Sequence, residues 1–305
     1  GLPTPRAQRV RSLDELFAAA EHVGFPAVVK PEFGASAMGC VRVDALEDLP
    51  KVYSLVRRVV SPEHNYIFRT GNDLLLEEYL DGVEFDVDLV LEDGKCLFSS
   101  VSQNWPTAEP SFQETGLHCP PDHSRRAVGR LVELSVQTVQ AFGFVQGVLH
   151  VEGKCTSHGP RIIEVNARMG GGRIHQVVEA VWGVDLVEAQ LRSCLELPQM
   201  LKPSRRPRCA VFDAIVHAPA SGRLAALPLP EVRPKGCLAL EVDVDVEIGA
   251  EVVGPDGVFA TTLAEVMVVG SDLRRAREAA AAVLRDPPEV VPTDSIDGVG
   301  LTPPE

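Results

Sequence analysis

The sequence of 305 residues contains no long apolar run, no paired-cysteine motif and no excess of basic side chains. No stretch approaches the roughly 18–20 apolar residues that span a bilayer, and no signal-peptide pattern opens the chain, so we expect no membrane contact. The 29 basic and 43 acidic residues give a net charge of −14, which excludes a protein that binds nucleic acid through a basic surface. Seven scattered cysteines without a CxxC pair indicate reduced thiols in a cytoplasmic protein, not disulfides or a zinc site.

The order of strand and helix patterns predicts an α+β fold, because strands alternate with helices early and hairpin signals dominate later. A break rich in proline and arginine at 203–208 predicts a first domain over 1–205. We expect a β-rich subdomain over 206–286, which ends in a helix, and a disordered tail over 287–305. The chain opens at Gly1 without methionine, and we interpret it as a piece of a longer polypeptide.

Local signals place the individual elements. Ser12 and Gly24 bound a predicted helix, since serine caps helix starts and glycine ends them. The remaining predictions are strands at 26–30, 41–43, 74–80, 83–91, 95–102, 146–152, 161–167, 209–217, 236–247 and 258–268, helices at 45–60, 124–142, 173–196 and 271–285, and long loops at 61–73 and 103–123.

Two neighbouring segments, 146–152 and 161–168, carry the strongest chemical signal. Alternate residues of a strand share a face, so Glu152 lies on one face of its strand, and Glu164 and Asn166 share a face of the next. If the strands pair, Glu152 and Glu164 can face each other, and such carboxylates repel unless a cation lies between them. The two carboxylates and the amide oxygen of Asn166 form a set of oxygen ligands that suits Mg²⁺ or Mn²⁺. The alternative is a solvated polar face on an edge hairpin.

The segment after this pair favours the metal interpretation. Arg168 lies on the same face as Glu164, and Gly170, Gly171 and Gly172 lead into the next helix. A guanidinium and a glycine-rich backbone would stand beside the metal, where they favour anions. Arg173 could clamp a substrate carboxylate through two hydrogen bonds. Its alternative is an exposed arginine at a helix start.

The segment around Lys30 indicates phosphate binding. The strand 26–30 ends in Lys30, and the small residues from Gly34 to Gly39 allow close backbone approach to a ligand. It is not a Walker loop, because GxxxxGK[ST] is absent and a strand follows. The alternative is a flexible turn after an exposed lysine.

A third motif runs from Leu74 to Asp88. An apolar strand ends in Glu77 and Glu78, and the next strand carries Glu84, Asp86 and Asp88 on one face. Because this acidic face would repel phosphates, a nucleotide here would present its sugar and base near Glu84. The alternative is a pair of amphipathic strands with a wet acidic face.

In this order, PxVVKP, a glycine flap, EEYLxGxE, HxE and IIEVNAR followed by GGG resemble the ATP-grasp superfamily of carboxylate–amine ligases over residues 1–285. The resemblance implies two α/β lobes that grip ATP, a small one at about 10–75 and a larger one at about 76–205. It also implies that the family's usual domain upstream of the ATP-grasp fold is missing, together with an ATP-contacting lysine.

The resemblance further implies roles for single residues in binding ATP and two Mg²⁺ ions (or Mn²⁺). Arg168 would stabilise the phosphoryl group in transfer. The implied ligand contacts are Lys30, Ser36, Ala37 and Met38 toward the phosphates, Glu77 toward the adenine amino group, Glu78, Tyr79 and Leu80 toward the adenine edge, Glu84 toward the ribose, and Glu152, Glu164 and Asn166 toward the metal ions, with Glu164 bridging.

Within the superfamily, GPRIIEVNARMGGGR resembles the branch of amino-acid ligases, most closely those that join β-alanine or γ-aminobutyrate to L-histidine. That implies a peptide bond formed through an acyl phosphate, with ADP and phosphate released, and amino-acid substrates contacted by Glu114, His118, Gly171, Gly172 and Arg173. We also expect a homo-oligomer of the full-length protein. The alternatives are a ligase for another pair of substrates and an inactive ATP-grasp scaffold that binds partners.

Overall fold

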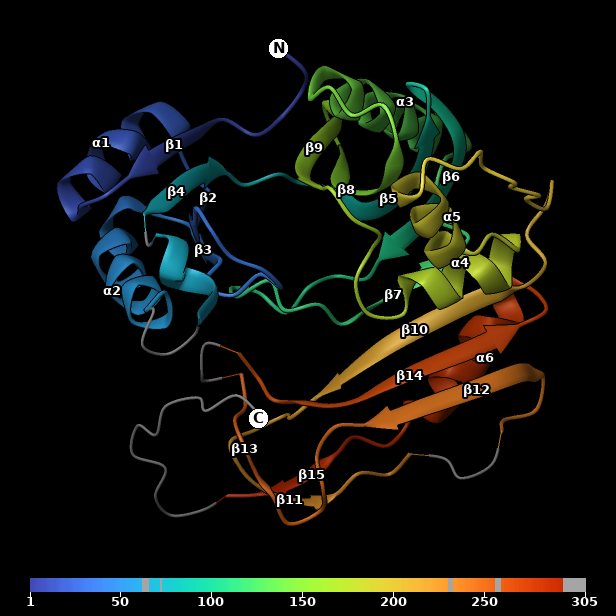
Figure 1. Cartoon of the computed structure of the whole chain (residues 1–305). Coiled ribbons are helices and arrows are strands. Elements are labelled where there is room, and N and C mark those ends of the chain that lie inside the picture. Colours follow the sequence, from blue (N-terminus) through green and yellow to red (C-terminus); the bar gives the residue numbers. More distant parts are fainter. Residues whose placement is uncertain (62–65, 72, 230–232, 256–258, 293–305) are drawn as a thin grey trace.

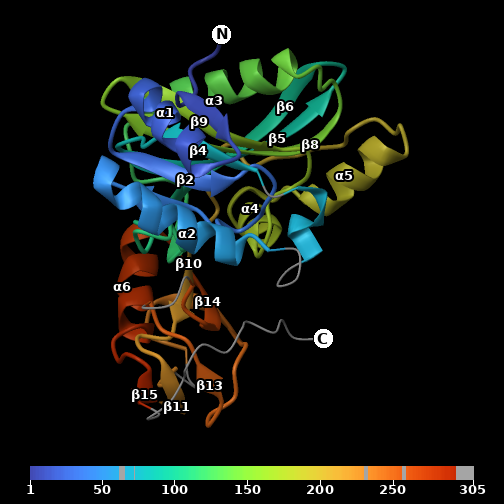
Figure 2. The same ribbon diagram turned by 90° about the vertical axis from the view of Figure 1, so that its left-hand side faces the viewer.

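The structure, a computed structural model, describes residues 1–61, 66–71, 73–229, 233–255 and 259–292. Figure 1 shows a small lobe at the upper left, a large lobe at the upper right and a β-rich region below. In the turned view of Figure 2, this lower region extends away from both lobes, with helix α6 along its side. All described strand pairs are antiparallel, which confirms the α+β class.

The small lobe is a four-stranded sheet with its helices on one face. The strand order is β1-β4-β2-β3, and α1 and α2 pack against the apolar side chains of β2 and β4. Ser12 caps α1 by accepting a hydrogen bond from the Glu15 amide, as predicted. The elements are β1 (Ala7–Val10), α1 (Leu13–Val23), β2 (Ala27–Pro31), β3 (Val41–Val43), η1 (Leu46–Asp48), α2 (Leu49–Val59), η2 (Tyr66–Thr70) and β4 (Leu74–Glu78).

The large sheet has eight strands in the order β12-β14-β10-β7-β6-β5-β8-β9. Helices α3 and α6 cover one face, and α4 and α5 cover part of the other. The strands are β5 (Val83–Glu92), β6 (Lys95–Asn104), β7 (Gly116–Cys119), β8 (Gly147–Thr156), β9 (Gly159–Asn166), β10 (Ala210–His217), β12 (Cys237–Val244) and β14 (Thr262–Gly270). The helices are α3 (Arg125–Ala141), α4 (Ile174–Trp182), α5 (Leu186–Cys194) and α6 (Leu273–Val283).

Strand alternation on β5 decides what the large sheet presents on each face. Phe85, Val87 and Leu89 are fully buried in the core beneath α3. Asp86 and Asp88 point to the opposite face, where both side chains are also buried. The core therefore fixes an acidic strip on the face of the sheet opposite α3.

The predicted helices and strands are largely confirmed, but β1 and the strands at 222–226 and 251–252 were not predicted, and three predictions need correction. The loop predicted at 103–123 contains β7, which joins β6 to β10 within the large sheet. The single helix predicted at 173–196 is two helices, because Gly183 adopts a left-handed conformation (φ 71°) that ends α4. The tail predicted to be disordered contains β15 (Glu289–Val291).

The C-terminal strands continue the large sheet across the boundary predicted near residue 206. Strand β15 completes a separate three-stranded sheet with β11 (Gly222–Ala226) and β13 (Glu251–Val252). Residues 62–65 and 72 of the predicted polar loop, and 293–305 of the predicted tail, lie outside the described residues.

Candidate active site

The carboxylates predicted to bind metal lie together on β8 and β9. Glu152 and Glu164 are direct cross-strand partners, as are His150 and Asn166. The Asn166 amide donates a hydrogen bond to Glu152 Oε1 (3.2 Å), and Asn166 Oδ1 accepts one from Arg168 (3.2 Å). Burial, and then the charges of Asp86 and Glu164, raise the pKa of Glu152 to about 8. A cation would relieve this crowding of negative charge, so the residues present fit Mg²⁺ or Mn²⁺.

The site supplies two carboxylates and one amide, which is fewer ligands than these ions require. Among the described residues, no group of three His, Cys, Asp or Glu side chains is arranged to hold a metal ion by itself. Substrate phosphates and water would complete the coordination, as is common for Mg²⁺.

Two buried carboxylates behind this pair were not assigned to the site from the sequence. Asp86 is the cross-strand partner of Glu152 and accepts a hydrogen bond from Asn104 (2.9 Å). Burial raises its pKa to about 7. Asp88 is the partner of His150 and lies 3.0 Å from its Nδ1. The alternation on β5 was visible in the sequence, but the burial of these side chains depends on the neighbouring strands.

His150 is held by these buried acids. Its Nε2 lies 3.7 Å from Glu152 and 3.9 Å from Asp86. Burial alone would lower the pKa of His150, but the hydrogen bond and charge of Asp88 outweigh it and raise the pKa to about 9. An imidazolium here would offset part of the negative charge beside the candidate metal ligands.

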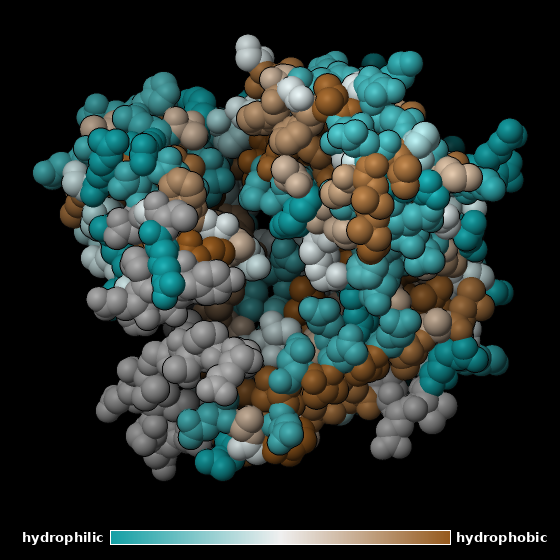
Figure 3. Space-filling view, viewed as in Figure 1, coloured by the Kyte–Doolittle hydropathy of each residue, from teal (hydrophilic) through white to brown (hydrophobic). Residues whose placement is uncertain are grey.

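The predicted phosphate-binding lysine faces the large lobe from the small one. Lys30 Nζ lies 2.7 Å from Glu77 Oε2, and both project from the face of the small sheet that the helices leave free. Burial raises the pKa of the nearby Cys40 thiol to about 12. The charge of Lys30 lowers this pKa, and the charges of Glu77, Glu164 and Glu152 raise it. Charged groups of both lobes therefore converge on one region, where Figure 3 shows a hollow in the surface.

The flap residues form a turn after β2. Ser36 and Ala37 have left-handed backbone conformations (φ 53° and 55°), and Ser36 is exposed. Met38 is half-buried and packs against the small-lobe core. The segment from Gly34 to Gly39 thus turns back on itself instead of extending a strand.

The predicted adenine and ribose contacts gather around Lys154, which the sequence reasoning missed. Lys154 Nζ lies 3.5 Å from Glu84 Oε2, 3.4 Å from the Leu80 carbonyl and 5.4 Å from the centre of the Tyr79 ring. Glu78 instead pairs with Arg6 (3.2 Å) and ties the chain start to β4. The alternation of side chains that places Glu152 on one face of β8 also places Lys154 on that face, so the position of Lys154 could have been predicted from the sequence.

The two predicted arginines occupy different environments. Arg168 is exposed beside Asn166. Arg173 is only 6% exposed and pairs with Asp213, Asp243 and Glu265 of three C-terminal strands. The alternative of an exposed arginine at a helix start is therefore wrong. The role of Arg173 toward a substrate carboxylate stays a prediction, with three acids already around the guanidinium.

The two predicted substrate residues of the long loop lie on different sides of the sheet. His118 stacks on Phe212 (4.9 Å) and accepts a hydrogen bond from Trp105, within the core beneath α6. The parity of β7 turns this side chain away from the acidic strip, and the substrate contact of His118 stays a prediction. Burial lowers its pKa to about 4.

Glu114 lies on the other side, near the acidic strip. Part of its side chain is exposed to solvent. The surrounding protein atoms nevertheless reduce the hydration of the carboxylate, and this desolvation, together with the charge of Glu84, raises the pKa of Glu114. Its loop is fixed by Gln113, which exchanges two hydrogen bonds with the backbone of Ala260. Glu114 thus faces the region between the nucleotide contacts and the C-terminal acids, and its substrate role stays a prediction.

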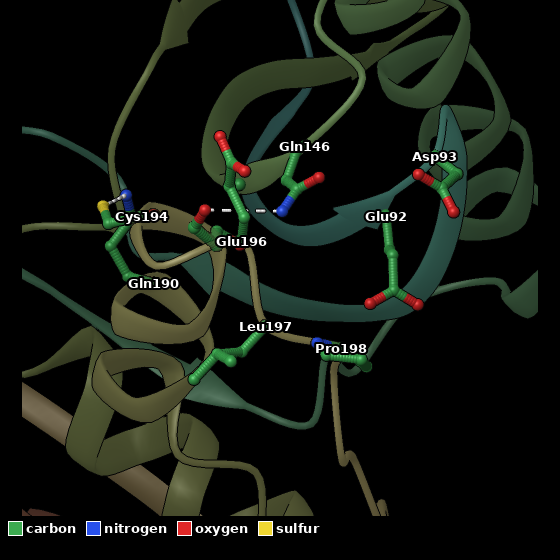
Figure 4. A pocket seen from close by; sticks show the side chains of 10 residues that line it. Glu92, Asp93, Gln146, Gln190, Cys194, Glu196, Leu197 and Pro198 are labelled. Carbon is green, nitrogen blue, oxygen red and sulfur yellow. Dashed lines mark hydrogen bonds between the residues drawn. The ribbon is translucent and has the colours of Figure 1, made fainter.

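A surface cavity of about 700 Å³ lies away from these residues, between the β5–β6 turn, the start of β8 and the end of α5. Figure 4 shows Glu92, Gln146 and Glu196 at its edge. Gly147, in its lining, precedes Glu152 by five positions on β8, about 17 Å along an extended strand. This cavity is therefore not the candidate active site.

Comparison with known proteins agrees with this geometry. A family model described as an ATP-grasp domain matches residues 23–176, and the chain belongs to this family. The sequence is 36% identical to carnosine synthase 1 of Gallus gallus over 211 residues, 67% of this chain and 22% of that protein. It is 36% identical to carnosine synthase 1 of Homo sapiens over 196 residues, 62% of this chain and 23% of that protein.

Bacterial ligases are more distant relatives. The L-arginine-specific L-amino acid ligase of Bacillus subtilis is 25% identical over 192 residues, 63% of this chain and 45% of that protein. The crystal structure of the L-amino acid ligase from Bacillus licheniformis matches 96% of this chain and 70% of that chain, with a TM-score of 0.81 and 23% identity. This likeness confirms the ATP-grasp fold. The chain spans only about a fifth of the length of the carnosine synthases it matches.

None of the described helices combines the length and the apolar character that crossing a bilayer requires.

Proposed function

We propose that the chain is the ATP-grasp part of an ADP-forming ligase that joins a carboxylate to an amine as a peptide bond. The observation that carries this proposal is the in-register pair of Glu152 and Glu164, with Asn166 and Arg168 on the same face and Lys30 facing it from the other lobe. Hard oxygen ligands beside two cationic side chains suit a metal-bound nucleoside triphosphate.

The reaction that fits these residues has two steps. A carboxylate oxygen of the donor attacks the γ-phosphorus of ATP, ADP leaves, and an acyl phosphate forms. The amine of the acceptor then attacks the acyl carbon, phosphate leaves and the amine loses a proton. A metal ion bound at Glu152, Glu164 and Asn166 would supply positive charge to the phosphate oxygens.

The protein's own residues would do the remaining work. Lys30 and Arg168 would hold and neutralise phosphate oxygens from opposite sides, and such fixed charges stabilise the transition state more than the ground state. An acyl phosphate is lost to hydrolysis if water reaches it, and closure of the flap 33–39 would exclude water.

For the substrates we propose β-alanine and L-histidine, which gives carnosine as the product. The proposal is supported by the 36% identity to two carnosine synthases, and it extends to the full-length protein. The alternative is another pair of amino acids, supported by the similarity to the L-arginine-specific L-amino acid ligase. The loops that carry Glu114 and Gly171 would decide between them, because they border the region where the substrates must meet.

The experiment is to measure phosphate release from ATP and Mg²⁺ by the full-length protein across a panel of amino-acid pairs. Release that requires both β-alanine and L-histidine supports the proposed substrates. Release with another pair keeps the ligase and rejects carnosine as the product. No release with any pair, despite ATP binding, would favour an inactive scaffold that binds partners.

Two further expectations belong to this proposal. All seven cysteines are free in the structure, and we propose a cytoplasmic location, where thiols stay reduced. We also propose that the full-length protein forms a homo-oligomer, which sedimentation or light scattering would test.

A further inference from the structure

We propose that Asp88 is a positioning residue that holds the glycine-rich segment after Arg168 in a fixed place relative to Glu152. The inference rests on the proposed function, since Arg168 and Glu152 serve catalysis only if the ligase reaction takes place.

One buried oxygen atom, Oδ1 of Asp88, contacts both the Gly170 amide and the His150 ring. Asp88 is fully buried at the centre of β5, and its Oδ1 accepts a hydrogen bond from the Gly170 amide (3.3 Å). The same atom lies 3.0 Å from Nδ1 of His150, which must carry a proton and donate, because the carboxylate only accepts. The other ring nitrogen of His150 lies 3.7 Å from Glu152. The contacts thus run from Gly170 through Asp88 and His150 to a metal ligand.

The burial of Asp88 has no evident benefit for the stability of the sheet. Its Oδ2 has no hydrogen-bond partner in the described structure, and an unpartnered polar atom in the interior costs stability. Val90, which follows Asp88 by two positions and lies on the same face of β5, is apolar and fully buried, so an apolar residue would suit this face of the strand. Residues that break the local pattern in this way are typical of functional sites.

The segment that Asp88 holds is anchored at both ends and exposed to solvent between them. Gly170 is buried, and a Cβ there would meet the Ile174 side chain at 2.6 Å, so the backbone approaches α4 closely. Arg173 fixes the other end through the acids of β10, β12 and β14. Gly171 and Gly172 between them are exposed, and nothing lies within 4 Å of a Cβ added to either. Such anchoring gives the precise placement that catalysis needs.

The test compares Asp88→Ala, Asp88→Asn and the control Ser100→Ala in the full-length protein. Ser100 is the buried cross-strand partner of Asp88 on β6, so its variant also removes a buried polar group from the same place in the sheet. The measurements are amide hydrogen exchange of the segment 167–173, and kcat and KM for ATP.

We expect Asp88→Ala to speed exchange at Gly170 and to lower kcat about 10- to 100-fold, with KM for ATP within about twofold of the parent. Asp88→Asn keeps a carbonyl oxygen as acceptor, and should retain the protection of Gly170 and recover part of kcat. Ser100→Ala should change neither. The inference is overturned if Asp88→Ala and Ser100→Ala show the same exchange over 167–173 or the same kcat.

A second variant covers the case in which Asp88→Ala does not fold. His150→Phe keeps a planar ring and removes both nitrogens, so we expect a lower kcat while Gly170 keeps its protection through Asp88. An unchanged kcat would overturn the connection to Glu152. If the parent protein turns over no substrate pair, the proposed function fails, whereas the exchange measurement still tests whether Asp88 holds the segment.

Discussion

Glu152 on β8 and Glu164 on β9 face each other directly, and among the described residues neither forms an ion pair with a lysine or arginine. Two facing carboxylates destabilise a strand pair unless something positive lies between them. The repulsion is therefore a cost of the metal-free fold, and a bound cation would remove it. This relationship leads to the first two predictions.

Glu164→Gln should abolish turnover and leave the fold intact. In metal-free protein above about pH 8, where Glu152 is ionised, the free energy of unfolding should rise by up to about 1 kcal/mol, because the change removes a like-charge pair. The stabilisation by Mg²⁺ and ATP should be lost. Thermal unfolding with and without the ligands, together with phosphate release, measures both effects. Glu133→Gln, on the exposed side of α3, is the matched control. Turnover at the parent rate in Glu164→Gln would show that the metal site is assigned wrongly.

The stability of the metal-free protein should fall as the pH rises from about 5 to about 9. The pKa of Glu152 is raised from 4.5 to about 8, and that of His150 from 6.5 to about 9. Between these values the folded protein binds more protons than the unfolded chain, so stability decreases with pH. Melting temperatures between pH 5.5 and 8.5 test the sign. Glu152→Gln should flatten the slope, and a melting temperature that rises over this range would contradict the prediction.

Lys30→Met should weaken ATP binding about 10- to 100-fold, the effect of losing a hydrogen bond to a charged group. Lys30 now pairs with Glu77, and we expect it to exchange this partner for phosphate oxygens. Calorimetric titration with MgATP measures the change. The control is Lys51→Met, an exposed lysine of α2. Equal affinities in the two variants would remove Lys30 from the nucleotide site.

Arg168 and Arg173 should respond in opposite ways to replacement by methionine. Arg173→Met leaves the buried Asp213 without its counter-ion, and should lower the free energy of unfolding by about 3 kcal/mol. Arg168→Met removes an exposed side chain, and should change stability by less than about 0.5 kcal/mol while turnover falls about 100-fold or more. Denaturant unfolding and phosphate release separate the two effects. A stability loss in Arg168→Met that matches its loss of activity would argue for a structural arginine.

The local elements and the pairing of Glu152 with Glu164 could be predicted because their signals are short-range. Ser12 and Gly24 bound α1 through contacts within one helical turn. Alternation on β8 and β9 places Glu152 and Glu164 on faces that a hairpin brings together, and the connection between the strands is short. The two-residue repeat of a strand and the chemistry of helix caps are sufficient to predict such features.

The features that the sequence did not reveal depend on distant partners. Strand β7 has only four residues, and its pairing with β10 joins His118 to Phe212 across the sheet. Without that pairing, the face on which His118 lies cannot be decided. The burial of Arg173 likewise depends on three acids that follow it by 40 to 92 residues. Pattern reasoning has no access to such contacts.

The proposed ligase reaction depends on activation of a carboxylate as an acyl phosphate, and transfer of an isotope label from that carboxylate to phosphate reports this step. The donor, β-alanine or whichever acid the panel selects, is labelled with ¹⁸O in its carboxylate and incubated with ATP, Mg²⁺ and the acceptor amine. We expect one ¹⁸O atom in each phosphate released by the parent protein, and no phosphate release by the Glu164→Gln variant. Unlabelled phosphate formed together with the peptide product would contradict an acyl-phosphate intermediate.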